Sequence, residues 1–135
     1  GESVRNVRFH DCDIIAAHGE GGVFTIHNGD RAVVEDIVYE NINVEHFYDR
    51  FIDLRILDSR YSKDAERGHI RAVTFRNIRA AANRHNSVSL IGGWDSEHLV
   101  EDVVLENVRI GERAVTCGDD IQLFTNRHVS GISFR

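Results

Sequence analysis

The clearest signal in the chain is VEDIVYENINV, residues 34–44, because the same pattern recurs along the sequence. It occurs as VRNVRFHDCDI at 4–14, as IRAVTFRNIRA at 70–80 and as VEDVVLENVRI at 100–110. A fifth copy begins as VSGISFR at 129–135, so successive copies start 30, 36, 30 and 29 residues apart. A period of this size is typical of a solenoid, in which each unit packs only against its neighbours.

Apolar residues alternate within each copy, and the alternation is interrupted once. The apolar places are the first, fourth, sixth, ninth and eleventh, which in this copy are Val34, Ile37, Tyr39, Ile42 and Val44. Such a pattern predicts two short strands joined by a tight turn. An Asp or Asn occupies the turn position in the four full copies: Asp11, Asn41, Asn77 and Asn107. These residue types tolerate left-handed backbone angles better than other non-glycine residues do.

A third apolar stretch follows in each repeat after a polar loop, at residues 23–26, 51–56, 88–91 and 121–124. Three short strands per repeat predict an all-β chain folded as a right-handed, single-stranded parallel β-helix of about four to five coils. A leucine-rich α/β solenoid, the main alternative, needs a leucine scaffold and helical segments that this sequence lacks. We expect residues 1–135 to form one domain, and the absence of Met suggests a fragment of a longer chain.

Charges at equivalent places of the repeat alternate in sign, which is what stacked coils require. The second place holds Arg5, Glu35, Arg71 and Glu101, and the seventh holds His10, Glu40, Arg76, Glu106 and Arg135. Equivalent residues of stacked coils lie ~4.8 Å apart, so opposite charges attract and a register shift would bring like charges together. The same stacking predicts one inward file made of Ile37, Val73 and Val103.

The two cysteines fall in different parts of the repeat. Cys12 shares the inward column of Ile42, Ile78 and Val108, so we expect a small, buried hydrophobe. Cys117 lies in the fourth coil's loop, ~14 Å away by strand spacing. A disulfide joins Cα atoms only ~4.4–6.8 Å apart, so we expect both thiols to be free. Two cysteines do not decide the compartment, and a secreted or periplasmic parent protein stays open.

Composition limits the partners. A formal net charge of −6, from 16 Lys and Arg against 22 Asp and Glu, argues against nucleic acid. The sequence has no run of roughly 18 apolar residues, which argues against a membrane. The histidines stand without a ligand motif, and we expect no metal and no cofactor. The terminal coils expose unpaired strand edges, so we expect end-to-end self-association or cover by coils missing from this sequence.

The pattern V-x-N/D-V-x-F-x-N-I-x-I resembles the coil consensus of polygalacturonase-like, family-28 type glycoside hydrolases and related pectin-active β-helix proteins. Residues 87–108 and 121–134 look like closing coils of large bacterial members. The resemblance implies inverting hydrolysis of a polygalacturonan-like polysaccharide in a cleft on the outer face of the third strand. The family's D-D motif is matched by Asp119-Asp120, and His18-Gly19 matches part of G-H-G. The family's N-T-D and R-I-K motifs are absent, and the order of the motifs differs. It therefore remains an alternative that the catalytic coils lie outside this chain.

Alternation divides the third strands into two faces. Inward positions are predicted for Phe24, Ile26, Ile52, Leu54, Val88, Leu90, Ile121 and Leu123. The outward column then consists of Thr25, Asp53, Ser89 and Gln122, and His27 and Arg55 begin the next column. The outward face of the third strands is therefore predicted to be a polar stripe.

The candidate catalytic residues are Asp53, Asp119 and Asp120. Coils two apart give an axial separation of ~9.6 Å, at the limit of the ~6.5–9.5 Å between the two carboxyl groups of inverting enzymes. Like-charge repulsion would raise the pKa of one of the adjacent aspartates and suit it to be the acid. Two alternatives remain: Asp119-Asp120 forms a polar turn that opens a strand, and Asp53 pairs with Arg55 or Arg84.

The candidate substrate-binding residues are His18, His27, Arg55, Tyr61, Trp94 and Gln122, with His85 in a flanking loop. A sugar needs hydroxyl partners and an apolar platform, which Tyr61 or Trp94 would supply. Trp94 is equally interpreted as a cap on the core. The leading hypothesis is therefore a polysaccharide hydrolase, and the alternative is a non-catalytic scaffold for carbohydrate binding or self-assembly. A cleft with converging carboxylates favours the enzyme, and a flat stripe favours the scaffold.

Overall fold

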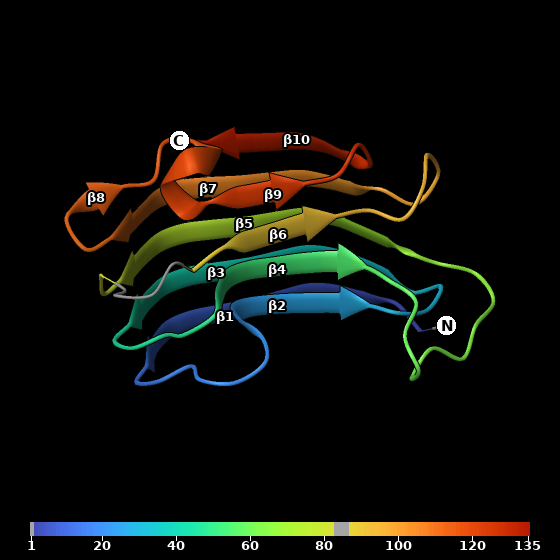
Figure 1. Cartoon of the computed structure of the whole chain (residues 1–135), viewed down its shortest axis with the longest axis horizontal. Coiled ribbons are helices and arrows are strands. Elements are labelled where there is room, and N and C mark those ends of the chain that lie inside the picture. Colours follow the sequence, from blue (N-terminus) through green and yellow to red (C-terminus); the bar gives the residue numbers. More distant parts are fainter. Residues whose placement is uncertain (1, 83–86) are drawn as a thin grey trace.

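The computed structural model describes residues 2–82 and 87–135 as a parallel β-solenoid of about four turns (Figure 1). One sheet has the order β1 (Val4–Ile14), β3 (Val33–Val44), β5 (His69–Ala80), β7 (Val100–Ile110) and β10 (Val129–Phe134). The second has the order β2 (Gly22–Asn28), β4 (Arg50–Ile56), β6 (Ser89–Gly92) and β9 (Leu123–Thr125). The predicted all-β solenoid is confirmed.

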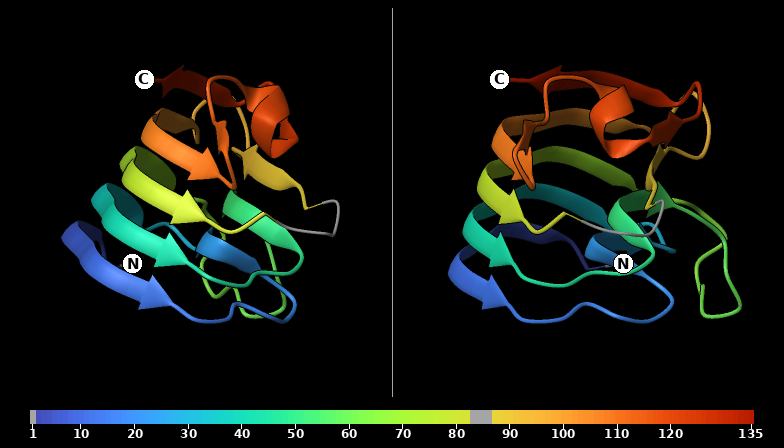
Figure 2. Two further views of the ribbon diagram at one scale, coloured as in Figure 1. Left: turned by 90° about the vertical axis from the view of Figure 1, so that its left-hand side faces the viewer. Right: turned by 60° about the vertical axis from the view of Figure 1, so that its left-hand side comes forward.

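Two short elements lie near the C-terminal end of the stack. Strand β8 (Arg113–Ala114) pairs antiparallel with the end of β7, and the 3₁₀ helix η1 (Gly118–Ile121) precedes β9. Figure 2 shows these elements beside the last coils, at the C-terminal end of the stack. Within the described residues, no helix has the length and apolar character needed to cross a membrane.

The long strands bend twice, not once. Left-handed backbone angles occur at the eighth place, as predicted, in Asp11, Asn41, Asn77 and Asn107. They also occur at the third place, in Asn6, Asp36, Ala72, Asp102 and Gly131. The strand pairing continues through both bends, so the first two predicted strands of each coil form one bent strand. The sequence pattern missed the first bend because Ala72 and Gly131 break the run of Asn and Asp.

The register of the long-stranded sheet is as predicted. Ile37 pairs with Val73 and Val73 with Val103, and all three are buried in the core. Glu35 lies between two arginines, 2.7 Å from Arg5 and 2.5 Å from Arg71. The apolar files and the charge columns therefore specify the same stacking.

The seventh-place column is confirmed with one change of partner. Arg76 contacts Glu106 at 2.6 Å and Glu40 at 3.4 Å. On the other side Glu40 pairs with Arg8, while the His10 ring contacts Asp11 at 2.9 Å. His10 is aligned with Glu40 in register, but the longer Arg8 side chain makes the ion pair.

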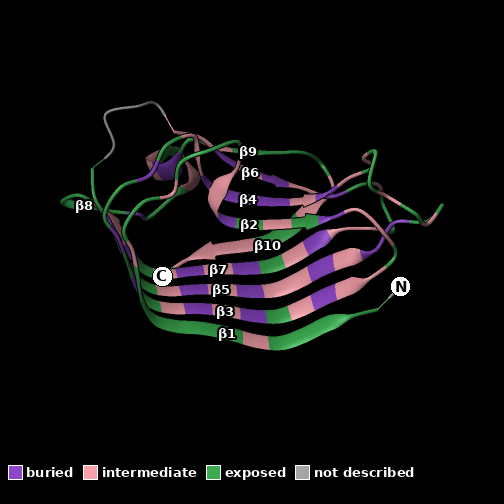
Figure 3. Cartoon of the chain, turned by 90° about the horizontal axis from the view of Figure 1, so that it is seen from below, coloured by how far each residue is buried: buried purple, intermediate pink, exposed green. Residues whose placement is uncertain are grey.

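The prediction that Cys12 is buried is wrong. Cys12 is aligned with Ile42, as expected, but both Cys12 and Cys117 are exposed free thiols. The physical reason is that β1 is the edge strand of its sheet, and Figure 3 shows most of it exposed. Phe9 on the same strand is 47% exposed and stacks on Tyr39 with ring centroids 5.1 Å apart.

The short-stranded sheet departs from simple alternation in its third and fourth coils. Phe24, Ile52 and Leu54 point into the core as predicted. Ser89, however, is fully buried, and Leu90 takes the outward position beside Asp53. The outward column is therefore Thr25, Asp53, Leu90 and Phe124. Val88 precedes the strand and is half-buried, and the predicted outward places of Ser89 and Gln122 in this column are wrong.

Ser89 is buried because its hydroxyl completes the backbone hydrogen bonding of the neighbouring coil. The Ile52 N–H donates to Ser89 Oγ at 3.3 Å, while the Phe51 N–H donates to the Val88 carbonyl at 3.0 Å. Inter-coil hydrogen bonds thus set this register, and the sequence alternation of a four-residue strand does not.

Candidate functional site

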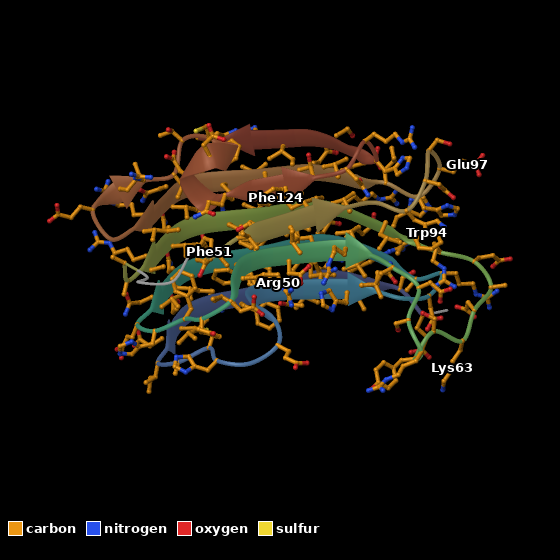
Figure 4. All side chains as sticks on the ribbon, in the orientation of Figure 1. Arg50, Phe51, Lys63, Trp94, Glu97 and Phe124 are labelled. Atoms are coloured by element: carbon orange, nitrogen blue, oxygen red, sulfur yellow. The ribbon has the colours of Figure 1, made fainter. Side chains whose placement is uncertain are left out.

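Asp53 lies on the outer side of β4 and yet is fully buried, at 0% exposure. Its carboxylate contacts Arg55 at 2.6 Å and 3.0 Å, Arg50 Nε at 2.9 Å and His27 Nε2 at 2.9 Å. The three cationic or polar side chains cover the carboxylate and exclude water from it. Figure 4 shows Arg50 on this face of the solenoid.

The environment of Asp53 favours a permanent negative charge. Burial opposes ionisation most strongly, but hydrogen bonds from Arg55 and His27 outweigh it and hold the pKa below its usual value. The predicted pairing with Arg55 is therefore present, while Arg84 and His85 lie outside the described residues. A carboxylate held in this way is a structural anion, and it is poorly placed to exchange a proton with substrate.

Asp120 is held by the turn that begins η1. Its Oδ2 accepts hydrogen bonds from the backbone N–H groups of Thr116, at 2.8 Å, and Cys117, at 3.2 Å, and from the Thr116 hydroxyl, at 3.1 Å. The hydrogen bond from the Thr116 N–H, together with those from the Thr116 hydroxyl and Cys117, lowers the pKa of Asp120. The expected raised pKa is therefore wrong for Asp120. Asp119 is exposed, and Gln122 ends the helix with φ of 46°.

The candidate carboxylates have separate surroundings. Asp53 belongs to β4 and Asp120 precedes β9, two coils further along the stack. Each carboxylate is therefore engaged by its own set of protein donors.

A depression of about 430 Å³ lies where β2 and β4 end. It is lined by His27, Gly29, Asp30, Leu57, Ser59, Tyr61 and Ser62. Tyr61 is 72% exposed, and the Arg60 guanidinium lies over its ring at 4.8 Å and donates to its hydroxyl at 2.6 Å. The two sequence-predicted residues His27 and Tyr61 are therefore brought together from different strands and loops.

Two residues that the sequence analysis missed hold the wall of this depression. Arg67 is buried and donates to the carbonyl oxygens of Gly29, Leu57 and Asp64. Asp30 accepts the backbone N–H groups of Lys63, at 2.7 Å, and Asp64, at 2.8 Å. Polar residues in a loop carry no periodic signal, so their structural role was invisible in the sequence.

The other predicted binding residues are placed apart from this depression. Trp94 is 46% exposed and lies against the Arg67 guanidinium, 5.7 Å from its ring centroid, so it does not cap the apolar core. His18 precedes β2, at the opposite end of the strands, and its ring faces Tyr48 with centroids 6.3 Å apart. Arg55 adjoins His27 but is engaged with Asp53.

Within residues 2–82 and 87–135, no group of three His, Cys, Asp or Glu side chains is arranged to hold a metal ion. A comparison of the chain with known protein families, with curated proteins and with solved structures found no match in any of the three.

Proposed function

We propose that this chain is a carbohydrate-binding β-solenoid segment, which holds an oligosaccharide in the depression beside Tyr61 and does not hydrolyse it with its own carboxylates. The observation that carries the proposal is the exposed ring of Tyr61, which lies next to the hydroxyl groups of Ser59 and Ser62 and the imidazole of His27. The loop that carries Tyr61 is held by the buried Arg67. The resemblance of the repeat to polysaccharide-active β-helix proteins is consistent with such a role.

The polar groups of the depression suit sugar hydroxyls. Ser59 Oγ accepts the Tyr61 N–H at 3.2 Å, and Ser62 Oγ accepts the Ser59 N–H at 3.1 Å. Each hydroxyl therefore accepts from the protein and keeps its own O–H to donate outward. The ring of Tyr61 offers an apolar face to the C–H groups of a sugar. A few polar groups beside an aromatic platform are what a saccharide site requires.

Binding is favoured over hydrolysis because the carboxylates of Asp53 and Asp120 are already engaged by protein donors. Asp53 is buried under Arg50, Arg55 and His27, and Asp120 accepts backbone hydrogen bonds from Thr116 and Cys117. Releasing the Asp53 carboxylate would leave the buried Arg50 Nε without its counter-charge, which is strongly unfavourable. In this proposal, Asp53 and Asp120 stabilise the scaffold, and none of Asp53, Asp119 and Asp120 acts as a catalytic group.

The test is a titration with neutral and uronic-acid oligosaccharides, followed by calorimetry and by amide chemical shifts. We expect Tyr61→Ala to weaken binding by about 10-fold, which corresponds to a loss of ~1.4 kcal/mol of binding free energy. Tyr48→Ala is the matched control, because Tyr48 is also exposed but lies before β4, at the other end of the strand. Equal effects of the two variants, or no binding of any oligosaccharide, would refute the proposal.

A hydrolysis assay separates this proposal from the enzyme hypothesis. Release of reducing ends is measured with the same substrates for the wild type, Asp53→Asn and Asp120→Asn. We expect no release by any of them. Release by the wild type that disappears in a folded Asp120→Asn variant would instead make the chain a hydrolase.

A further inference from the structure

A second hollow, about 450 Å³ in volume, lies on the last segment of the long strands. Its walls include the turn asparagines Asn41, Asn77 and Asn107 and the two arginines Arg79 and Arg109. It shares no lining residue with the depression beside Tyr61. We refer to it below as the amide groove.

The asparagines of the amide groove form a ladder along the stack. Asn41 Nδ2 donates to Asp11 Oδ1 at 3.0 Å, Asn77 Nδ2 to Asn41 Oδ1 at 3.1 Å, and Asn107 Nδ2 to Asn77 Oδ1 at 2.9 Å. Each side-chain amide has two N–H groups and uses one in the ladder. The second N–H groups therefore form a row of exposed donors spaced by ~4.8 Å, the distance between stacked strands.

The tenth place of the repeat breaks the charge rule that the other columns follow. It holds Asp13, Asn43, Arg79 and Arg109, which pair in that order. Arg79 and Arg109 are direct neighbours, so two like charges face each other where the second and seventh places alternate in sign. Like charges directly opposite each other on a sheet are destabilising.

No ion pair with a described residue neutralises this arginine pair, and the acidic lining residues Asp11 and Asp13 belong to the first coil, two strands away from Arg79. Arg79 has no hydrogen-bond or ion-pair partner among the described residues, and Arg109 donates to the Glu112 carbonyl oxygen at 2.7 Å. Both side chains line the groove beside the amides of Asn77 and Asn107. Two guanidinium forks next to unused amide donors match the oxygen atoms of an anion.

We propose that the amide groove binds an oxyanion, a carboxylate or a phosphate, carried by a hydroxyl-bearing small ligand. Arg79 and Arg109 hold the anionic group, and Asn77 and Asn107 donate to it or to the adjacent hydroxyls. The bound charge removes the repulsion between the two arginines. This site lies beyond the proposed function, because it uses another face of the solenoid and stands or falls without Tyr61.

Three probes that share one sugar ring test the site: glucose, glucuronate and glucose 6-phosphate. The side-chain amide signals of Asn77 and Asn107 are followed by NMR during each titration. We expect shifts with a charged probe and none with glucose, and the two charged probes distinguish carboxylate from phosphate recognition. The shifts should weaken as salt is added. Equal shifts with glucose, or none with either charged probe, would overturn the proposal.

Charge variants sharpen the test. We expect Arg79→Gln to weaken binding of the charged probe by at least about 10-fold, in line with a lost charge-assisted hydrogen bond. Arg127→Gln is the matched control, because Arg127 is an exposed arginine outside the groove. Unchanged affinity in Arg79→Gln, or equal losses in both variants, would contradict the site.

Arg79→Glu restores the alternation of charge and gives a second, independent readout. Without probe, we expect its Tm to exceed that of the wild type, since the like-charge contact is replaced by an ion pair with Arg109. The charged probe should raise the Tm of the wild type and leave that of Arg79→Glu unchanged. A lower Tm of Arg79→Glu without probe would remove the electrostatic basis of the proposal.

Discussion

The two sheets of the solenoid differ in how deeply their charged side chains are buried. On the long-stranded sheet, Glu35 lies between Arg5 and Arg71 at the surface. On the short-stranded sheet, Asp53 is fully buried and contacts Arg50 and Arg55. Water screens exposed ion pairs, so each contributes little, whereas a buried charge that loses its partner is strongly destabilising.

The difference separates two tasks of charge in one fold. The surface columns act against wrong register, because a shift by one coil would bring like charges together along the whole stack. The buried cluster concentrates stability at one residue. Arg50 Nε shows this dependence: it is buried, has no hydrogen-bond partner in the described structure and lies 2.9 Å from Asp53. Removing the carboxylate therefore leaves this group uncompensated.

The largest effect is expected for Asp53→Asn, which keeps the shape of the side chain and removes its charge. Breaking a buried ion pair on one side typically lowers the free energy of unfolding by ~3–5 kcal/mol. Glu35→Gln is the matched control on the other sheet, and its loss should be far smaller. Urea unfolding followed by circular dichroism measures both. Similar losses in the two variants would show that the sheets do not differ in this respect.

The difference in stability between the wild type and Asp53→Asn should depend on pH with a defined sign. The folded pKa of Asp53 is lowered, so its stabilising contribution is fully present above the unfolded value of ~3.9 and is lost as pH falls through the folded pKa. Asn does not titrate. The stability difference between the wild type and Asp53→Asn should therefore shrink when the pH is taken below ~4. A difference that stays constant down to pH ~2 would contradict the assignment.

The sheets also differ in how far their registers follow from the sequence. The long strands carry five apolar places, an Asn or Asp turn and two charge columns, and these signals agree on one stacking. The segment 88–91 is short and mostly apolar, so simple alternation placed Ser89 outward. Its observed burial depends on a hydrogen bond to Ile52 in the neighbouring coil, which alternation does not contain.

Ser89→Ala tests that register directly. The buried Ile52 N–H would lose its partner, and an unsatisfied buried donor lowers the free energy of unfolding by ~1–3 kcal/mol. Ser130→Ala, at an exposed position of β10, serves as the control and should leave stability nearly unchanged. A neutral Ser89→Ala variant would favour the outward position that the alternation predicted.

Apart from Tyr61 in the loop after β4, the candidate site was predictable only where it lies on strands. His27, Asp53 and Arg55 follow from strand register, and the structure brings them together. Arg50, Arg67 and Asp30 were missed. Arg50 stands three residues before Asp53, a spacing that carries no signal in a twisted strand. Arg67 and Asp30 act through loop carbonyl and amide groups, whose positions depend on the fold as a whole.

The smallest expected effect concerns Ala72, which occupies the first bend of the long strand with φ of 54°. The equivalent places hold Asn6, Asp36, Asp102 and Gly131, all suited to this backbone region. A left-handed angle costs an L-residue such as Ala ~1–2 kcal/mol, and glycine avoids this at an entropic cost of ~0.5–1 kcal/mol.

Ala72→Gly should therefore raise the free energy of unfolding by up to ~1 kcal/mol, because the relief of backbone strain exceeds the added entropy of the unfolded chain. Ala65→Gly, in an exposed loop outside the positive-φ residues, carries only the entropic term and should lower it. Opposite signs in the two variants, measured in parallel urea titrations, are the expected result. If Ala72→Gly were destabilising by as much as Ala65→Gly, the bend would store no strain, and the missing Asn at this place would have no energetic consequence.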